Sequence, residues 1–177
     1  MEELIQMAQK GDNRAYTELI RILEKDLYRI AFTRLKNDDD IFDAIQNTLL
    51  NVYKNIKKLR KIQYFKTWVI KILINECNTI YRNNMKHNKI IEKVSDLNIE
   101  YIEKSIDNIS TFKGFNEMIL KLNSDEQLIF TLYYKDKYSC EEISKITKIN
   151  KNTIKSKLDR GREKIKEFLK EDYEDVN

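Results

Sequence analysis

The sequence predicts an all-α protein made of two small helical domains joined by a flexible linker. The 177-residue chain has no proline and three glycines, whereas sheets with tight turns usually need more of both. Apolar residues make up 41% of the chain and recur at the three- and four-residue spacing of amphipathic helices. Because strict alternation of apolar and polar residues is also missing from the sequence, we expect almost no strand.

The first half of the chain has the pattern of a helical bundle. Asp12 is placed to cap a long helix with an inward stripe at Ala15, Leu19, Ile22, Leu23, Leu27, Ile30 and Ala31. The acidic run 38–40 complements the dipole at the start of a second helix, with core positions at Ile41, Ala44, Ile45, Leu49 and Val52. A basic connection over 57–63 then leads into a third helix from about Phe65 to Arg82.

A change in composition separates the two domains. We assign 1–84 to the first domain and 85–114 to the linker, which is rich in Asn, Lys and Ser and loses helical regularity. The second domain covers 115–170 and is followed by an acidic tail, 171–177, which we expect to fray. Ser124 and Gln127 have the spacing of a capping box, which predicts a helix through Leu128, Ile129, Leu132 and Tyr133.

The segment 139–166 has the layout of a helix-turn-helix. Ser139 and Glu142 form a capping box at the start of a short helix, in which Ile143 and Ile146 share one face. The periodicity breaks at 147–149. Lys148 occupies the turn position that usually holds glycine, where a left-handed residue with a Cβ costs about 1 kcal/mol.

The second helix of this segment is strongly basic. Asn150 is a good N-cap, and Ile154, Leu158 and Ile165 recur at helical spacing toward the core. Between 145 and 166 there are nine lysines or arginines against two acids, and between 54 and 93 there are eleven against two. A solvated surface is the simpler explanation of such charge, but two basic blocks on patterned helices favour two contacts with DNA phosphates.

Several function classes find no support in the sequence. We expect no membrane span or signal peptide, because the apolar run after Trp68 is interrupted at Lys71. Cys77 and Cys140 lack metal-ligand spacing and suit the reducing cytoplasm as buried thiols. With no P-loop and a single histidine, His87, the chain is not expected to be an enzyme, and we expect neither a cofactor nor a small-molecule substrate.

Four stretches in this order resemble one protein family, the extracytoplasmic-function (ECF) sigma factors of the sigma-70 family of bacterial RNA polymerase. They are AQKGDNRAYTELI near the N-terminus, the helix with Asp40, Asp43 and Gln46, the stretch FKTWVIKILIN over 65–75, and the helix-turn-helix 139–166. The resemblance covers about 1–82 and 115–168. It implies two helical domains, regions 2 and 4, that direct polymerase to promoters.

The resemblance also implies roles for individual residues. Asp40, Asp43 and Gln46 would bind core RNA polymerase, although residue chemistry alone favours an ordinary exposed helix face for them. The −10 element, once melted, would be met by Lys66, Trp68, Lys71, Asn75 and Arg82. Asn75 would read a flipped base, since its amide both donates and accepts hydrogen bonds. Trp68 is about as well explained as a core residue, and one ring edge could serve both purposes.

The duplex −35 element would be met by Thr153, Lys155, Ser156, Asp159 and Arg160. Arg and Lys pair with guanine in the major groove, whereas an acid such as Asp159 repels phosphate but accepts from a cytosine amine. The basic connection 57–63 lacks the Arg-Gly of many family members. These two departures leave the promoter preference open.

The partners implied by the resemblance are core RNA polymerase, promoter DNA and an anti-sigma factor, either soluble or membrane-bound. Some relatives work without an anti-sigma factor. The expected location is the cytoplasm, in the nucleoid when the chain is bound to polymerase. The alternative is a stand-alone DNA-binding regulator with a ligand-sensing N-terminal domain, but it leaves 65–75 and the Asp43/Gln46 face unexplained.

Overall fold

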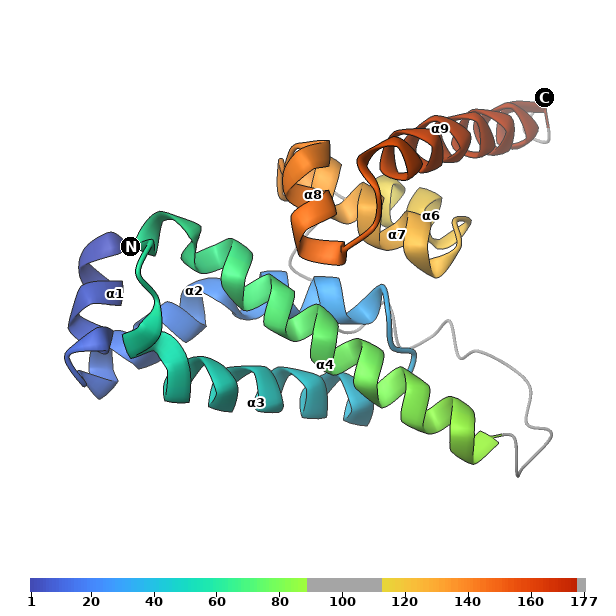
Figure 1. Cartoon of the computed structure of the whole chain (residues 1–177). Helices are drawn as coiled ribbons and strands as arrows, with labels where there is room; N and C mark the ends of the chain where they lie inside the picture. The colour runs from blue at the N-terminus through green and yellow to red at the C-terminus, as the bar shows by residue number, and fades with distance from the viewer. Residues whose placement is uncertain (89–112, 175–177) are drawn as a thin grey trace.

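The computed structural model describes residues 1–88 and 113–174, which form two helical bundles (Figure 1). The N-terminal bundle consists of α1 (Glu2–Gln9), α2 (Asn13–Phe32), α3 (Asp38–Asn55), the short 3-10 helices η1 (Ile56–Lys58) and η2 (Ile62–Tyr64), and α4 (Phe65–Asn88). The C-terminal bundle consists of α6 (Lys113–Leu120), α7 (Ser124–Phe130), the π-helical segment η3 (Thr131–Lys135), α8 (Cys140–Thr147) and α9 (Lys151–Glu174). No strand occurs within the described ranges, which confirms the predicted all-α class.

The N-terminal bundle follows the predicted caps and stripes closely. The Asp12 carboxylate accepts hydrogen bonds from the backbone N–H groups of Arg14 at 2.8 Å and Ala15 at 3.1 Å, as expected of an N-cap. The predicted stripe of α2 is buried except at Ile22, which is 44% exposed. Ile22 lies about 100° round the helix from Leu23, outside the arc that faces α3 and α4.

Two helices end later in the sequence than predicted. Helix α4 runs to Asn88, beyond the expected end at Arg82, so the first residues assigned to the linker are helical. Helix α9 likewise continues to Glu174, into the predicted acidic tail. The rest of the predicted linker, 89–112, and the last residues, 175–177, lie outside the described ranges.

The capping box of α7 lies one residue earlier than predicted. Asn123, rather than Ser124, accepts from the backbone N–H of Glu126 at 3.0 Å, and the Glu126 carboxylate accepts from the Asn123 N–H at 3.2 Å. The Ser124 hydroxyl instead donates to the carbonyl of Thr33 in the N-terminal bundle at 2.7 Å, and Gln127 donates to the Leu122 carbonyl at 2.7 Å. Asn caps a helix as well as Ser does, and the ionised Glu126 is a stronger acceptor than Gln127.

Segment η3 carries one residue more than a regular helix turn would. The N–H of Asp136 donates to the carbonyl of Thr131, five residues back, at 3.1 Å. The chain then passes through Lys137, which has a positive φ of 60°, toward α8. The π turn therefore determines the direction in which Asp136 leaves the helix.

The helix-turn-helix has the predicted construction. Ser139 and Glu142 make both bonds of the capping box, and Lys148 adopts the left-handed conformation with φ 63°. The Ser144 hydroxyl donates to the Ile149 carbonyl at 2.7 Å, which closes the turn. Behind the turn, Ile143, Ile146, Ile154 and Leu158 are all buried.

Helix α9 also packs closely on α7. A Cβ at Gly161 would lie within 2.6 Å of the Phe130 ring, so any larger residue at this crossing would have to displace the ring. The Lys164 ammonium of α9 lies 2.8 Å from the buried Glu126 carboxylate. Burial disfavours the charged form of Glu126, but the bonds from Lys164 and from the Asn123 N–H outweigh it and leave its pKa below the usual value.

Candidate nucleic-acid and polymerase interfaces

One face of α4 carries four of the five residues predicted to meet −10 DNA. They follow one another at three, four and seven residues, which places them on one side of the helix: Trp68, Lys71, Asn75 and Arg82. The last three are exposed, whereas Trp68 is half-buried with its ring 6.2 Å from that of Phe65. Trp68 therefore packs against the core while part of its side chain stays accessible, and its contact with −10 DNA remains a prediction.

Lys66, the fifth predicted residue, lies on a different side of α4. Its ammonium is 2.6 Å from the Asp26 carboxylate of α2 and 3.6 Å from Asp136 of the C-terminal bundle. Burial lowers the pKa of Lys66, but its contacts with Asp26 outweigh burial and leave the pKa above its usual value. Lys66 is thus a charged anchor between helices, apart from the other four residues.

The residues predicted to meet −35 DNA form one continuous exposed face on the first three turns of α9. They are Thr153, Lys155, Ser156, Asp159 and Arg160. Asp159 lies 3.1 Å from Arg162, so its repulsion of phosphate is partly offset. Lys157 turns the other way and pairs with Asp125 of α7 at 3.2 Å. The exposed face combines cations with short polar side chains, which is typical of a helix that lies in the major groove.

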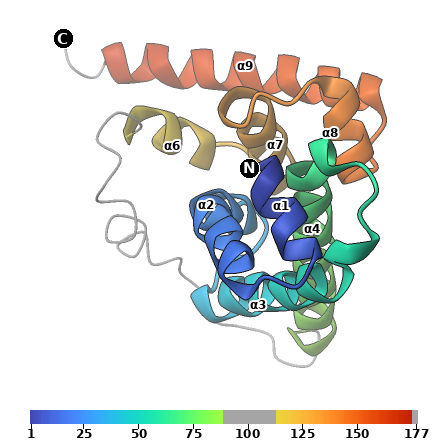
Figure 2. The same ribbon diagram turned by 90° about the vertical axis from the view of Figure 1, so that its left-hand side faces the viewer.

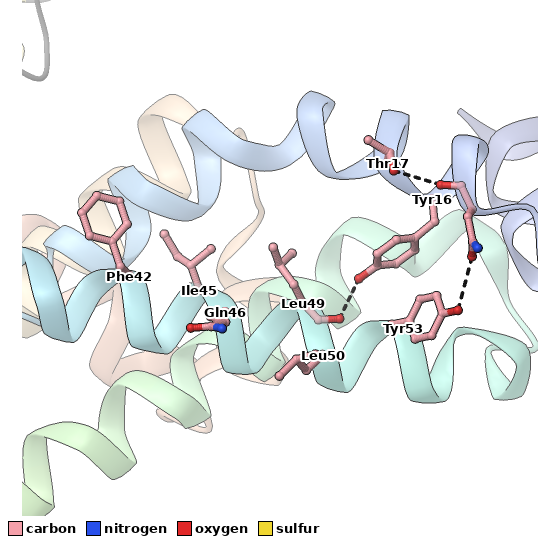
Figure 3. Close-up of a pocket in the computed structure, with 9 residues that line it drawn as sticks. Tyr16, Thr17, Phe42, Ile45, Gln46, Leu49, Leu50 and Tyr53 are labelled. Carbon is pink, nitrogen blue, oxygen red and sulfur yellow. Dashed lines mark hydrogen bonds between the residues drawn. The ribbon is translucent and has the colours of Figure 1, made fainter.

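A shallow apolar groove runs between α2 and α3 (Figure 3). It is lined by Asn13, Tyr16, Thr17, Phe42, Ile45, Gln46, Leu49, Leu50 and Tyr53. Tyr16 donates to the Leu49 carbonyl at 2.6 Å, and Tyr53 donates to the Asn13 side chain at 3.2 Å. Burial raises the pKa of Tyr16 to about 12, so this hydroxyl stays a neutral donor.

One of the three predicted polymerase-binding residues lines the groove. Gln46 lines it, and Asp43 is exposed one turn earlier on α3. Asp40 instead accepts from the Asn84 side chain at 2.7 Å and ties α3 to α4. The sequence reasoning did not foresee the exposed Phe42, although a second stripe on α3, at 42, 46, 49 and 53, was a readable signal.

The two bundles are joined by charged contacts, and α8 packs on α4 (Figures 1 and 2). The Asp136 carboxylate accepts from Arg29 of α2 at 2.9 Å, and its side chain is only 2% exposed. Burial raises the pKa of Asp136. A second contact joins Asp125 of α7 to Arg34 at 2.7 Å. Burial disfavours the charged form of Asp125, but the bond from Arg34 outweighs it and leaves the pKa below its usual value.

Two family models match the chain and together cover most of it. Sigma-70 region 2 matches 19–87, and Sigma-70, region 4 matches 114–165. The chain belongs to the ECF group of the sigma-70 family. As a sigma factor of this group, it directs promoter recognition in transcription initiation. We name the bundle α1–α4 region 2 and the bundle α6–α9 region 4, after these two matches.

Named relatives agree with this assignment. The sigma factor is 28% identical to the RNA polymerase sigma factor SigV of Bacillus subtilis over 138 residues. The aligned residues cover 78% of this chain and 81% of SigV. It is 24% identical over 184 residues to the ECF sigma factor SigW of the same organism, and this alignment covers 97% of each chain.

Two solved structures share the fold. One is CnrH in complex with the cytosolic domain of CnrY, with a TM-score of 0.65, 16% identity and 97% coverage of each chain. The other is the sigma factor RpoE in complex with the anti-sigma factor NepR from Bartonella quintana, with a TM-score of 0.67 and 21% identity, covering 88% of this chain and 96% of that one. In the described part of this sigma factor, no helix is long and apolar enough to cross a membrane.

Proposed function

We propose that this sigma factor binds core RNA polymerase and reads two promoter elements with two separate helix faces. The α4 face with Asn75 meets one strand of the melted −10 element, and the α9 face with Lys155 meets the −35 duplex. The observation that carries the proposal is the presence of one exposed, cation-bearing face on each bundle. Like other sigma subunits, it does no covalent chemistry of its own.

The chemistry of each face suits its target. Along α4, Lys71 and Arg82 provide positive charge on either side of Asn75, and Trp68 offers a ring edge for an unstacked base. Along α9, the cations Lys155 and Arg160 reach phosphates or guanine edges. The proposal leaves Lys66 out of the −10 contact, because its ammonium is engaged by Asp26.

The α2–α3 groove is the proposed contact with core polymerase. It presents unpartnered apolar surface, with Phe42 59% exposed, beside the polar side chains of Asp43 and Gln46. Protein interfaces combine such an apolar centre with a polar rim. Asp40 supports this surface indirectly, because its bond to Asn84 holds α3 against α4.

An anti-sigma factor is a further proposed partner. The support is that CnrH and RpoE, two similar proteins of known structure, were each solved in a complex, and that NepR is named as an anti-sigma factor. Co-expression with the products of neighbouring genes, followed by purification of a complex, would test this partner.

The proposed function is tested by run-off transcription with core polymerase and a panel of promoters that differ at single −10 positions. We expect transcripts that depend on this chain, and Asn75→Ala should change the −10 preference while core binding is unchanged. The matched control is Asn83→Ala, an exposed asparagine elsewhere on α4. If no promoter in the panel yields a chain-dependent transcript while the chain alone binds operator DNA tightly, the stand-alone regulator is the better reading.

A further inference from the structure

Region 4 carries an acid that is buried among the charges of region 2. Asp136 contacts Arg29 of α2 at 2.9 Å and lies 3.6 Å from Lys66 of α4. Asp26 completes the cluster, because it contacts the same arginine and the same lysine at 2.6 Å each. A side chain that is 2% exposed and whose ion-pair partners belong to the other region is a structural link between the two regions.

A second attachment lies at the opposite end of the same helical segment. Asp125 contacts Arg34 at 2.7 Å, and the neighbouring Ser124 donates to the Thr33 carbonyl at 2.7 Å. About 11 residues separate Asp125 from Asp136, so the attachments are on the order of 16 Å apart along the α7–η3 axis. Two attachments at that separation determine the orientation of region 4 as well as its contact.

The link has the energetics of a contact that can be released. Arg29 Nε and Asp136 Oδ2 are buried and form no hydrogen bond to any part of the chain that the structure describes. Each such atom subtracts from the gain of the ion pairs, and buried ion pairs contribute little net stability even when complete. A competing surface therefore needs only modest affinity to displace region 4.

The linked arrangement does not match the spacing of a promoter. Elements centred near −35 and −10 are about 25 base pairs apart, or about 85 Å at 3.4 Å per base pair. Helix α4 has 24 residues and is about 36 Å long, and α8, the first helix of the −35 reader, packs directly on it. The two reading faces cannot reach both elements until region 4 leaves region 2.

We propose that Asp136 and Asp125 of region 4, held by Arg29, Lys66 and Arg34 of region 2, form a latch that keeps the free sigma factor shut. The latch rests on the proposed function in one respect, namely that opening is required for reading two elements. Its effect on activity follows from the fraction of chains that are open. A partner that binds only the open form has an apparent affinity equal to its intrinsic affinity multiplied by that fraction. The latch thus sets the sigma-factor concentration at which transcription begins.

The test compares Arg29→Gln/Arg34→Gln with the matched control Arg14→Gln/Arg21→Gln. Both variants lose two positive charges from region 2. Arg14 and Arg21, however, are exposed on α2, and Arg21 pairs with Glu18 of the same helix. Small-angle scattering of the free chain and hydrogen exchange in 62–75 and 136–146 report on opening without polymerase. Titration of each variant into core polymerase at a fixed promoter concentration reports on function.

We expect the latch variant to show a larger radius of gyration, faster exchange in both segments and half-maximal transcription at about tenfold lower concentration. The control should match the wild type. Unchanged scattering and exchange in the latch variant would overturn the latch, and opening without a shift in the titration would overturn its regulatory effect.

Two further comparisons keep the test decisive. If the double variant misfolds, Arg34→Gln alone serves, because within the described residues the Arg34 side chain bonds only to Asp125 and to the amide of Asn78. If no variant supports transcription, the proposed function fails, whereas the scattering and exchange comparison still decides whether the latch exists.

Discussion

A methyl group added at Gly161 probes the packing of the −35 reader directly. The new Cβ would lie 2.6 Å from Cζ of Phe130 and closer still to Cε2, whereas carbon atoms in contact sit about 3.5–4.0 Å apart. The Phe130 ring has little room to retreat, since it is 2% exposed and packs 5.3 Å from the ring of Tyr134. Overpacking of this kind costs about 1–3 kcal/mol.

The higher helix propensity of alanine partly offsets this cost. Replacing glycine by alanine inside a helix stabilises it by about 1 kcal/mol. Gly161→Ala should therefore lower the free energy of unfolding of region 4 by about 0–2 kcal/mol. The value is measured by native-state hydrogen exchange of amides in α7 and α9, because exchange resolves region 4 within the whole chain.

A second background separates the two contributions. Phe130→Leu removes the ring edge that the methyl group would meet, so Gly161→Ala added to it should stabilise region 4 by up to about 1 kcal/mol. The sign of the alanine effect should thus reverse between the backgrounds. The same effect in both, or a stabilisation of the wild type, would refute the inferred clash.

Four further results are expected. Leu50→Ala should weaken core-polymerase binding about tenfold, measured by equilibrium binding. Ile22→Ala, which shortens a similarly exposed apolar side chain outside the groove, should not weaken it, and equal losses would contradict the groove as the binding surface. Lys155→Ala should reduce the salt dependence of promoter binding by about one unit of log–log slope, and an unchanged slope would place this lysine away from phosphate. Burial raises the pKa of Cys77 to about 12, so its native thiolate fraction is less than about a thousandth of an ordinary thiol's, and alkylation at pH 8 followed by mass spectrometry should find it protected until unfolding. The pKa of Glu126 is lower in the fold than in the unfolded chain, so its contribution to stability is present above about pH 4.3 and is lost as the pH falls through the folded pKa. Glu126→Gln should therefore reduce the loss of region 4 stability at acid pH. If stability depends on pH identically in the variant, the Glu126 ion pair is not the cause of that loss.

Features that depend on a few neighbouring residues could be predicted from the sequence. The Asp12 cap, the Ser139–Glu142 capping box and the left-handed Lys148 all appear in the structure, because a cap or turn is built from side chain and backbone within one helical turn. The exposed face of α9 could be predicted for a related reason, because helical periodicity assigns a side to each residue, whereas the face of α4 came from the resemblance to the family.

Features that depend on competition or on distant partners could not be predicted. At the start of α7, Asn123 and Ser124 offer two overlapping capping boxes, and the contact of Ser124 with Thr33 removes one of them from the choice. The resemblance to the family placed Lys66 at the −10 element. The partners that its ammonium has in the structure, Asp26 and Asp136, are 40 and 70 residues away, and no local pattern pairs them.

The π turn of η3 suggests how the contact between regions 2 and 4 can be gained or lost during evolution. A π turn differs from an α-helical one by a single inserted residue, and one residue corresponds to about 100° of rotation about the helix axis. Losing one codon within 131–135 would swing Asp136 away from Arg29, while the apolar patterns of both cores stayed readable in the sequence. Related chains could thus differ in whether regions 2 and 4 are in contact in the free sigma factor, and still share every motif by which the family is recognised.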